Sequence, residues 1–472
     1  MMKRASIAFL KLYANAFFFL VGNSTRPVRN SSVNSSQTKY REAYACVWLP
    51  GETEAVVAGR LSADGGLVNF YYCESYLARE DAVALYLPEL PLKRGELPLL
   101  DGLTMPSSLR DAAPDAWGRR VLLNRNFGCT DSELDNHELS ELIFLLESGS
   151  DRIGALDFQL SEKEYVPRLP MSAALEELVT SAQRVENGIP LSAKRDQSLY
   201  LGGAVGGARP KALFEDRDSK YVAKFSSSSD SYNVVKAEYV AMRLAELCGI
   251  NVAPVSLVNI CGQDVLLVER FDRLNSETGW QRKMMISALT ILGLDEMMAR
   301  YASYADLANI IRYRFREPKA ELRELFSRIV FNILTGNNDD HARNHAAFWD
   351  GEMLSLTPAY DICPQGRTGQ ETSQAMLIIR GKRASRLATR IEASHQFLLS
   401  HDEAMEIFEA QLSCITANWA DVCDEASLSI DARNYFWGRQ FLNPYAFTAL
   451  EGSSVQIAKH AQALIGATAS YP

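Results

Sequence analysis

Apolar and polar positions alternate along the first part of the chain in short runs. Residues 43–49, 54–61 and 67–73 are rich in Val, Ala and aromatic residues, and turns containing Gly or Pro separate them. A period of two between such turns is typical of antiparallel strands. The sequence therefore predicts a β-meander, followed by a helix after Pro114 and by a helix and a short strand between 140 and 160.

Farther along, the pattern changes twice. After a glycine-rich stretch, residues 221–225 form an apolar run that contains one lysine, Lys224, and this run predicts a strand. A helix and then a hairpin ending at Arg273 are expected next. Beyond Arg273 the spacing of apolar residues predicts mostly helices. The exception is a hairpin around Asp350-Gly351, a strong two-residue turn signal.

Composition sets broad limits. The chain has 472 residues, of which 47% are hydrophobic, enough for two or three packed domains. Its formal charge of −9 and pI of about 5.4 exclude adhesion to nucleic acid through bulk charge. The basic stretch 311–319 is interpreted as a solvated helix face. The eight cysteines form no CxxC pair and no zinc spacing, which favours reduced thiols in a cytoplasmic protein.

The N-terminal residues have a basic start and an apolar run, the outline of a signal peptide. Lys11 and Asn15 interrupt the run, no A-x-A cleavage pattern follows, and the run is barely long enough for a membrane helix. We therefore expect a cytoplasmic protein with a flexible extension over residues 1–39. Membrane targeting and an upstream start codon stay open as alternatives.

The helix predicted over 320–335 ends at Gly336, and a strongly polar loop follows it. Asp339, Asn344 and, after the hairpin, Asp361 come in the order that protein kinases use for phosphoryl transfer. There, the first Asp takes the hydroxyl proton, while the Asn and the second Asp hold Mg²⁺. Mg²⁺ prefers oxygen ligands at about 2.0–2.1 Å, and a loop and a hairpin exit can bring such ligands together.

Two other interpretations of this loop stay open. Asp340, His341 and His345 could form a His-Asp site of a metal-dependent hydrolase, with the two His at i and i+4. That requires a helix through the loop and further His ligands. The chain has six His, and none outside this loop lies in a recognisable ligand motif. The loop could also be only a polar turn.

A kinase also requires a lysine on a strand for the ATP phosphates and a helix carboxylate that orients it. Lys224 is alone in its apolar strand, and a lone buried charge needs a partner. Glu238, on the helix that follows, can be that partner. The glycines before the strand would let the backbone approach phosphates closely, although their spacing matches no standard nucleotide-binding motif.

In combination, these segments resemble the HipA family of bacterial serine/threonine kinases. The matching segments are 114–120, 151–158, 206–212, 222–225, 268–273, 337–346 and 356–361. The resemblance implies an α+β, two-lobed, protein-kinase-like fold with an N-terminal β-rich subdomain and an α-helical C-terminal lobe. The implied divisions are an extension over 1–39, the β-rich subdomain over 40–165, the ATP-binding part of the N-lobe over 166–273, and the C-lobe with the catalytic loop over 274–472.

Family roles carry over where residues match. Asp339 takes the place of the catalytic aspartate, and Asn344 and Asp361 take those of the Mg²⁺ ligands. The residues that the resemblance assigns to ATP binding are Lys224 at the phosphates, Glu269 and Phe271 at the hinge, His341 beside the catalytic aspartate, and Gly206, Gly207, Ala208, Arg209, Pro210 and Lys211 in the nucleotide-covering loop.

The resemblance implies an ATP- and Mg²⁺-dependent protein serine/threonine kinase that is the toxin of a toxin–antitoxin pair. Aminoacyl-tRNA synthetases or other translation factors are the implied protein substrates, and a separate helix-turn-helix antitoxin is the implied partner. The chain has no helix-turn-helix signature of its own, so direct nucleic-acid binding is not expected. Membrane association is not expected either, because Lys11 and Asn15 interrupt the N-terminal apolar run. A nucleotide-binding, kinase-like regulatory partner without transferase activity is the alternative.

One position departs from the family pattern. Kinases of this family commonly carry, seven residues before the loop lysine, a serine whose autophosphorylation switches the enzyme off, and here that position is Ala204. Alanine has no hydroxyl, so we predict that activity persists during incubation with Mg·ATP, with no phosphate on 202–211 by mass spectrometry. Activity that fell in step with phosphate on Ser198 would contradict this prediction.

Overall fold

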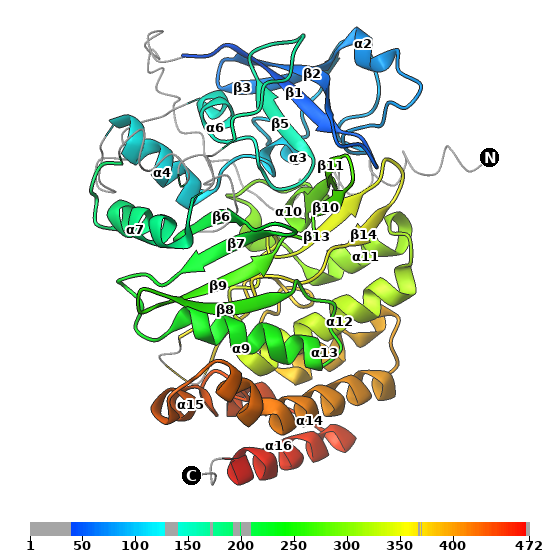
Figure 1. Ribbon diagram of the computed structural model, residues 1–472. Coiled ribbons are helices and arrows are strands. Elements are labelled where there is room, and N and C mark those ends of the chain that lie inside the picture. Colours follow the sequence, from blue (N-terminus) through cyan, green and yellow to red (C-terminus); the bar gives the residue numbers. More distant parts are fainter. Residues whose placement is uncertain are drawn as a thin grey trace, which may run out of the picture. The chain divides into compact units, whose positions relative to one another are not determined.

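The computed structural model describes residues 39–127, 140–169, 173–191, 199, 209–366, 369 and 371–468. They belong to one compact unit that begins at Lys39. Strands are concentrated early and helices late in these residues (Figure 1). None of the helices described is long and apolar enough to cross a membrane. The divisions expected from the sequence stay predictions, and the extension before Lys39 lies outside the described residues.

The predicted β-meander is confirmed as an antiparallel sheet with the order β4-β3-β2-β1-β5. Its strands are β1 (Glu42–Trp48), β2 (Ala55–Asp64), β3 (Leu67–Tyr72), β4 (Glu96–Leu97) and β5 (Leu156–Gln159). Ala43, Ala45 and Val47 of β1 are buried in its core, which accounts for the period of two in the sequence. The helices of this region are α2 (Glu74–Leu77), α3 (Ser107–Arg110), α4 (Ala116–Phe127) and α6 (Glu141–Glu147).

A second antiparallel sheet, with the order β6-β7-β9-β8, carries the lysine strand. Its elements are β6 (Lys211–Glu215), β7 (Lys220–Phe225), β8 (Val255–Ile260) and β9 (Gln263–Glu269), and its helices are α7 (Leu175–Glu186) and α9 (Val234–Leu247). Asn233 caps α9 by accepting the Lys236 N–H at 2.9 Å. Because α9 packs against β8 and β9, it presents Glu238 to the sheet that carries Lys224.

The strands after this sheet differ from the prediction. β9 ends at Glu269 rather than at Arg273. A hairpin of β10 (Arg273–Ser276) and β11 (Gly279–Arg282) follows where helices were expected, and β12 (Met285–Ser287) pairs with the later β13 (Ala346–Trp349). The missed signal was the turn-forming stretch that ends at Gly279.

The predicted second hairpin is present, although its turn is longer than expected. It consists of β13 (Ala346–Trp349) and β14 (Leu354–Leu356), so the turn covers 350–353 rather than two residues. Asp350 Oδ1 accepts the N–H groups of Glu352 and Met353 at 2.9 and 2.8 Å. This side-chain turn replaces the tighter backbone turn that the Asp-Gly pair predicted.

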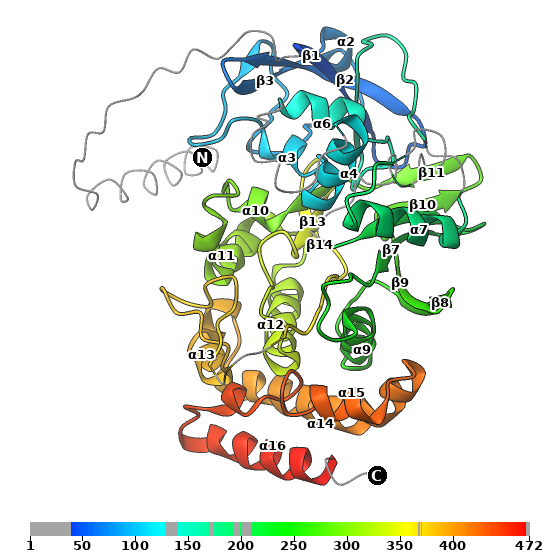
Figure 2. The same ribbon diagram turned by 90° about the vertical axis from the view of Figure 1, so that its left-hand side faces the viewer.

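The C-terminal part is helical, as expected. Its helices are α10 (Ala288–Ile291), α11 (Tyr304–Arg314), α12 (Pro318–Thr335), α13 (Leu387–Glu392), α14 (His401–Glu425), α15 (Ile430–Phe436) and α16 (Val455–Thr468). α14 packs against α9, α12 and α16 (Figure 2). One long helix therefore contacts both the helix that carries Glu238 and the helix that leads into the polar loop.

A buried ion network joins the two sheets. Asp151 Oδ1 accepts from Arg270 and Arg273, each at 2.9 Å, and Asp272 accepts from the Gly154 N–H at 2.7 Å. Burial alone would raise the pKa of Asp151, but the two guanidiniums hold it well below its usual range. The network therefore fixes the chain just after β9, at the predicted hinge, against the segment before β5.

Gly336 fixes the start of the polar loop. It ends α12 with a φ of +69°, and a Cβ at this position would lie 2.6 Å from the Gln440 carbonyl oxygen. Only glycine combines this conformation with so close an approach.

We predict that Gly336→Ala lowers the free energy of unfolding by about 2–4 kcal/mol, the left-handed strain plus overpacking. Gly249→Ala is the matched control, because Gly249 follows α9 with a φ of +79° and has open space around it. That substitution should cost only the strain, about 1–2 kcal/mol. Urea unfolding of both variants measures the difference, and equal losses would refute a specific role for the Gln440 contact.

Candidate functional site

Lys224 is the centre of the candidate site. Its ammonium nitrogen lies 2.5 Å from Glu238 Oε1 and 2.5 Å from Asp361 Oδ1. The predicted pairing with Glu238 is confirmed, whereas the pairing with Asp361 was not predicted. Burial alone would lower the pKa of Lys224, but the two carboxylates raise it above its ordinary value. The lysine is therefore held as a cation between α9 and the segment after β14.

Asp361 closes this ion pair in an unusual backbone conformation. Its φ of +59° is uncommon for a residue other than glycine and often marks a functional position. Burial would raise its pKa, but Lys224 brings it to about 2, so the carboxylate is ionised at neutral pH. The pKa of Glu238 moves upward instead, because burial outweighs the same lysine.

The polar loop exposes Asp339 to solvent. The Asn344 side chain donates to the Asp339 carbonyl at 3.1 Å, and the His341 N–H donates to the same carbonyl at 2.8 Å. Partial burial raises the pKa of Asp339, His341 opposes this shift, and the Asp361 carboxylate adds to it. The negative charge of Asp361 therefore acts on Asp339, and the Asn344 side chain fixes the Asp339 backbone within the loop.

Asp340 points into the core instead. Its Oδ2 lies 3.0 Å from His345 Nε2 and accepts a short hydrogen bond from the Tyr304 hydroxyl. All three side chains are buried. In the part of the chain that the structure describes, no group of three or more His, Cys, Asp and Glu side chains is arranged to hold a metal ion. The arrangement therefore gives Asp340 and His345 a role in packing and does not support the hydrolase interpretation.

Asn344 and Asp361 fit Mg²⁺ better than a transition metal. Mg²⁺ in phosphoryl-transfer enzymes usually takes one or two protein carboxylates and completes its shell with substrate phosphates and water. Asp361 is ionised, and Asn344 uses its amide N–H for the Asp339 carbonyl, which leaves the amide oxygen as its acceptor group. Both donors are hard oxygens, as this ion requires.

The predicted nucleotide-covering loop is described only in part. Gly206, Gly207 and Ala208, like Ala204, lie outside the described residues. Arg209 pairs with Asp230 at 2.6 Å, and the Pro210 carbonyl accepts the Phe225 N–H at 3.0 Å. Lys211 stands directly opposite Lys224 in the β6–β7 pairing. Its ammonium lies 3.2 Å from Asp115, a partner that was not predicted.

The predicted hinge residues present backbone groups that the sheet does not satisfy. Glu269 donates its N–H to the Pro254 carbonyl at 2.9 Å, but Pro254 has no N–H to return to the Glu269 carbonyl. Among the described residues, the Phe271 N–H has no hydrogen-bond partner. The Phe271 ring packs edge-on against Phe348 at 6.0 Å. A carbonyl and an N–H two residues apart, neither with a hydrogen-bond partner in the part of the chain that the structure describes, are what recognition of an adenine edge requires.

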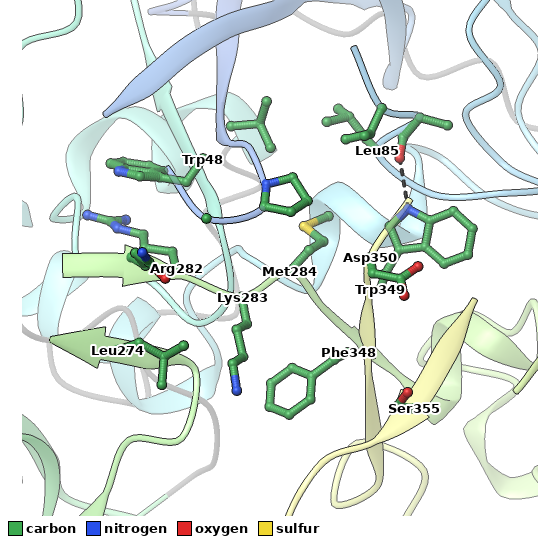
Figure 3. A pocket seen from close by; sticks show the side chains of 16 residues that line it. Trp48, Leu85, Leu274, Arg282, Lys283, Met284, Phe348, Trp349, Asp350 and Ser355 are labelled. Atoms are coloured by element: carbon green, nitrogen blue, oxygen red, sulfur yellow. Dashed lines mark hydrogen bonds between the residues drawn. The ribbon is translucent and has the colours of Figure 1, made fainter. Parts of the chain in front are cut away.

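A separate cavity of about 330 Å³ lies between the first sheet, the β10–β11 hairpin and β13 (Figure 3). The Arg282 guanidinium stacks over the Trp48 ring there at 3.4 Å, and the Lys283 ammonium lies 4.8 Å from the centre of the Phe348 ring. None of the predicted site residues lines this cavity. The candidate site is therefore defined by its charged side chains and not by this pocket.

Two family models match the chain. The HipA N-terminal domain matches residues 47–159, and the HipA-like C-terminal domain matches residues 203–419. The chain belongs to the HipA family. The second match contains Lys224, Glu238 and all residues of the polar loop.

Relatives with curated names include the serine/threonine-protein kinase toxin HipA of Shewanella oneidensis. It is 29% identical over 160 residues, which are 30% of this chain and 36% of that protein. The putative kinase Y4mE of Sinorhizobium fredii is 24% identical over 335 residues, 67% of this chain and 76% of that protein. A putative kinase of Haemophilus influenzae is 25% identical over 228 residues, 44% of this chain and 61% of that protein. The family is thus one of kinases, although the first match spans only about a third of its relative.

A solved structure supports the fold. Shewanella oneidensis HipA, determined in complex with HipB and operator DNA, matches with a TM-score of 0.60 at 18% identity. The match covers 90% of this chain and 96% of that one. The predicted α+β, two-lobed, kinase-like fold is confirmed, with a β-rich first region and a helical second region.

We predict opposite effects on stability for substitutions at the adjacent aspartates Asp339 and Asp340. Asp339→Asn should leave the thermal midpoint within about 2 °C of wild type, because exposed substitutions change stability by roughly 0.5 kcal/mol or less. Asp340→Asn should lower the free energy of unfolding by about 1–3 kcal/mol, because a neutral amide oxygen accepts more weakly from Tyr304 and His345 than a carboxylate, and a buried NH2 group replaces the second carboxylate oxygen. Thermal unfolding followed by circular dichroism compares them. A larger loss in Asp339→Asn would contradict the assignment.

Proposed function

We propose that this chain is an ATP- and Mg²⁺-dependent protein serine/threonine kinase. The observation that carries the proposal is the ion pair of Lys224 with both Glu238 and Asp361, beside an exposed Asp339. A partly buried lysine between a helix carboxylate and a loop carboxylate is the arrangement that protein kinases use at the ATP phosphates. Membership of a kinase family supports the same conclusion.

Each residue has a defined task in this proposal. Asp339 accepts the proton of the attacking hydroxyl, and its exposure lets a protein side chain reach it. Lys224 binds the ATP phosphates. Asn344 and Asp361 would hold Mg²⁺, which when bound neutralises charge on the transferred phosphoryl group. The backbone groups of Glu269 and Phe271 would bind adenine.

The substrate and partner follow the family. The Shewanella relative is named a toxin and was solved with HipB and operator DNA. We extend this to a toxin role for the present chain, with a helix-turn-helix antitoxin as partner and DNA contact only through it. The substrate would be a protein of translation, such as an aminoacyl-tRNA synthetase, and the location the cytoplasm.

The test is transfer of labelled γ-phosphate to proteins of a bacterial lysate. We predict that Asp339→Asn lowers the rate by about 10²- to 10⁴-fold, the effect of losing a general base. Its affinity for Mg·ATP should stay within a few-fold of wild type, because Lys224 and the hinge remain. Mass spectrometry then identifies the labelled protein.

Near-normal transfer by a folded Asp339→Asn variant would refute the role of Asp339. Wild-type protein that binds Mg·ATP but labels nothing, itself included, would favour the regulatory alternative, a nucleotide-binding partner without transferase activity. Metal-dependent hydrolysis by the wild-type protein that is lost when His345 is substituted would support the metal-dependent hydrolase interpretation instead.

A further inference from the structure

The segment 110–117 belongs to the N-terminal region, yet it binds both the backbone and the side chain of Lys211 in the second sheet. The Trp117 indole N–H donates to the Lys211 carbonyl at 2.8 Å. The Asp115 carboxylate accepts from the Lys211 ammonium at 3.2 Å. The Lys211 side chain is only 3% exposed and that of Asp115 only 15%, so solvent screens this pair little. Trp117 and Asp115, which precede Lys211 by 94 and 96 positions, thus fix its position.

The start of α4 holds Asp115 in place. One carboxylate oxygen accepts the Gly118 N–H at 2.9 Å, and the other faces Lys211. Asp115 therefore caps the helix and binds the lysine with different atoms. The Arg119 guanidinium donates to the Pro114 carbonyl at 3.1 Å and fixes the preceding turn. The position of the carboxylate is set before any ligand arrives.

The other end of the same segment, at Asp111, contacts Ser287 and lies near Arg343 of the polar loop. Asp111 accepts the N–H and the hydroxyl of Ser287 at 2.8 and 2.7 Å. The Arg343 guanidinium, in the polar loop, lies 3.9 Å from Asp111 and also pairs with Glu296. Its carbonyl accepts the Tyr360 hydroxyl at 2.7 Å, one residue before Asp361. The segment thus braces both the sheet and the loop of the candidate site.

The charges explain why Lys211 needs its own carboxylate. It faces Lys224 directly across the β6–β7 ladder, and like charges in opposite positions repel. Lys224 is neutralised by Glu238 and Asp361, and Lys211 by Asp115. The Lys211 charge also acts on Asp361. Without Asp115, Lys211 would be drawn to Asp361, the predicted Mg²⁺ ligand.

We infer that Asp115 is a positioning residue for Mg·ATP, which it serves by holding the Lys211 ammonium at the phosphate end of the site. This inference rests on the proposed function of that site. The N-terminal β-rich region then contributes to nucleotide binding, since it supplies Asp115, the carboxylate that pairs with Lys211 of the second sheet.

Asp115→Asn tests the inference in the full chain, because Asn keeps the helix cap and removes only the charge. We expect affinity for Mg·ATP, measured by calorimetry, to fall about tenfold, as is usual when a partner that orients a ligand-binding group is lost. Affinity for adenosine, which has no phosphates, should stay within twofold. Lys211→Met should weaken Mg·ATP as well, and the double variant should be no weaker than Lys211→Met alone.

Asp81→Asn is the control, since Asp81 is exposed in the same region and pairs only with Arg79 among the described residues. It should bind both ligands like wild type. If Asp115→Asn does not fold, Asp115→Ser, which also caps the helix, takes its place. Wild type that fails to bind Mg·ATP would overturn the proposed function. Wild-type affinity in the folded Asp115 variant, or equal losses for adenosine and Mg·ATP, would overturn the inference alone.

Discussion

The ion pair of Lys224 with Glu238 and Asp361 is the interaction on which the rest of the site depends. A lysine in an apolar strand is tolerated only with a close counter-charge, because an ammonium removed from water without one is strongly unfavourable. Here the counter-charges come from α9 and from the chain after β14, so the pair ties the second sheet to the helical region. Mg·ATP would exchange part of this ion pair for phosphate and metal contacts rather than meet an unpaired lysine.

Several supports keep the partners of that lysine in place. α14 packs against both α9 and α12, and Gly336 lets the polar loop turn away from α12 close to Gln440. The Asp151 network fixes the hinge, and the segment 110–117 reaches both the second sheet and the polar loop. The N-terminal region therefore contributes to the geometry of the site, which accounts physically for its presence in the same chain.

Local pattern was sufficient to predict the elements and part of the site. The period of two predicted β1 to β3, the glycine stop predicted the end of α12, and the isolated charge of Lys224 predicted its pairing with Glu238, 14 residues away. Pairings such as Lys224 with Asp361, 137 residues away, and Lys211 with Asp115 depend on how lobes pack, which periodicity does not encode. The β10–β11 hairpin was missed because the turn-forming stretch that ends at Gly279 was not recognised. The long turn at Asp350 was missed because the Asp350 side-chain bonds outweighed the simple two-residue turn signal. The predicted roles in ATP and Mg²⁺ binding stay predictions.

The central claim is that Lys224, Asn344 and Asp361 surround one Mg·ATP. A crystal structure with Mn²⁺ and a nonhydrolysable ATP analogue tests it most directly, because the anomalous signal locates the metal independently of the protein. The account predicts one metal peak within ligand distance of Asn344 and Asp361, the phosphates on Lys224, and adenine against the backbone of Glu269 and Phe271. A metal bound by Asp340 and His345, or a nucleotide seated in the cavity beside Trp48, would contradict it.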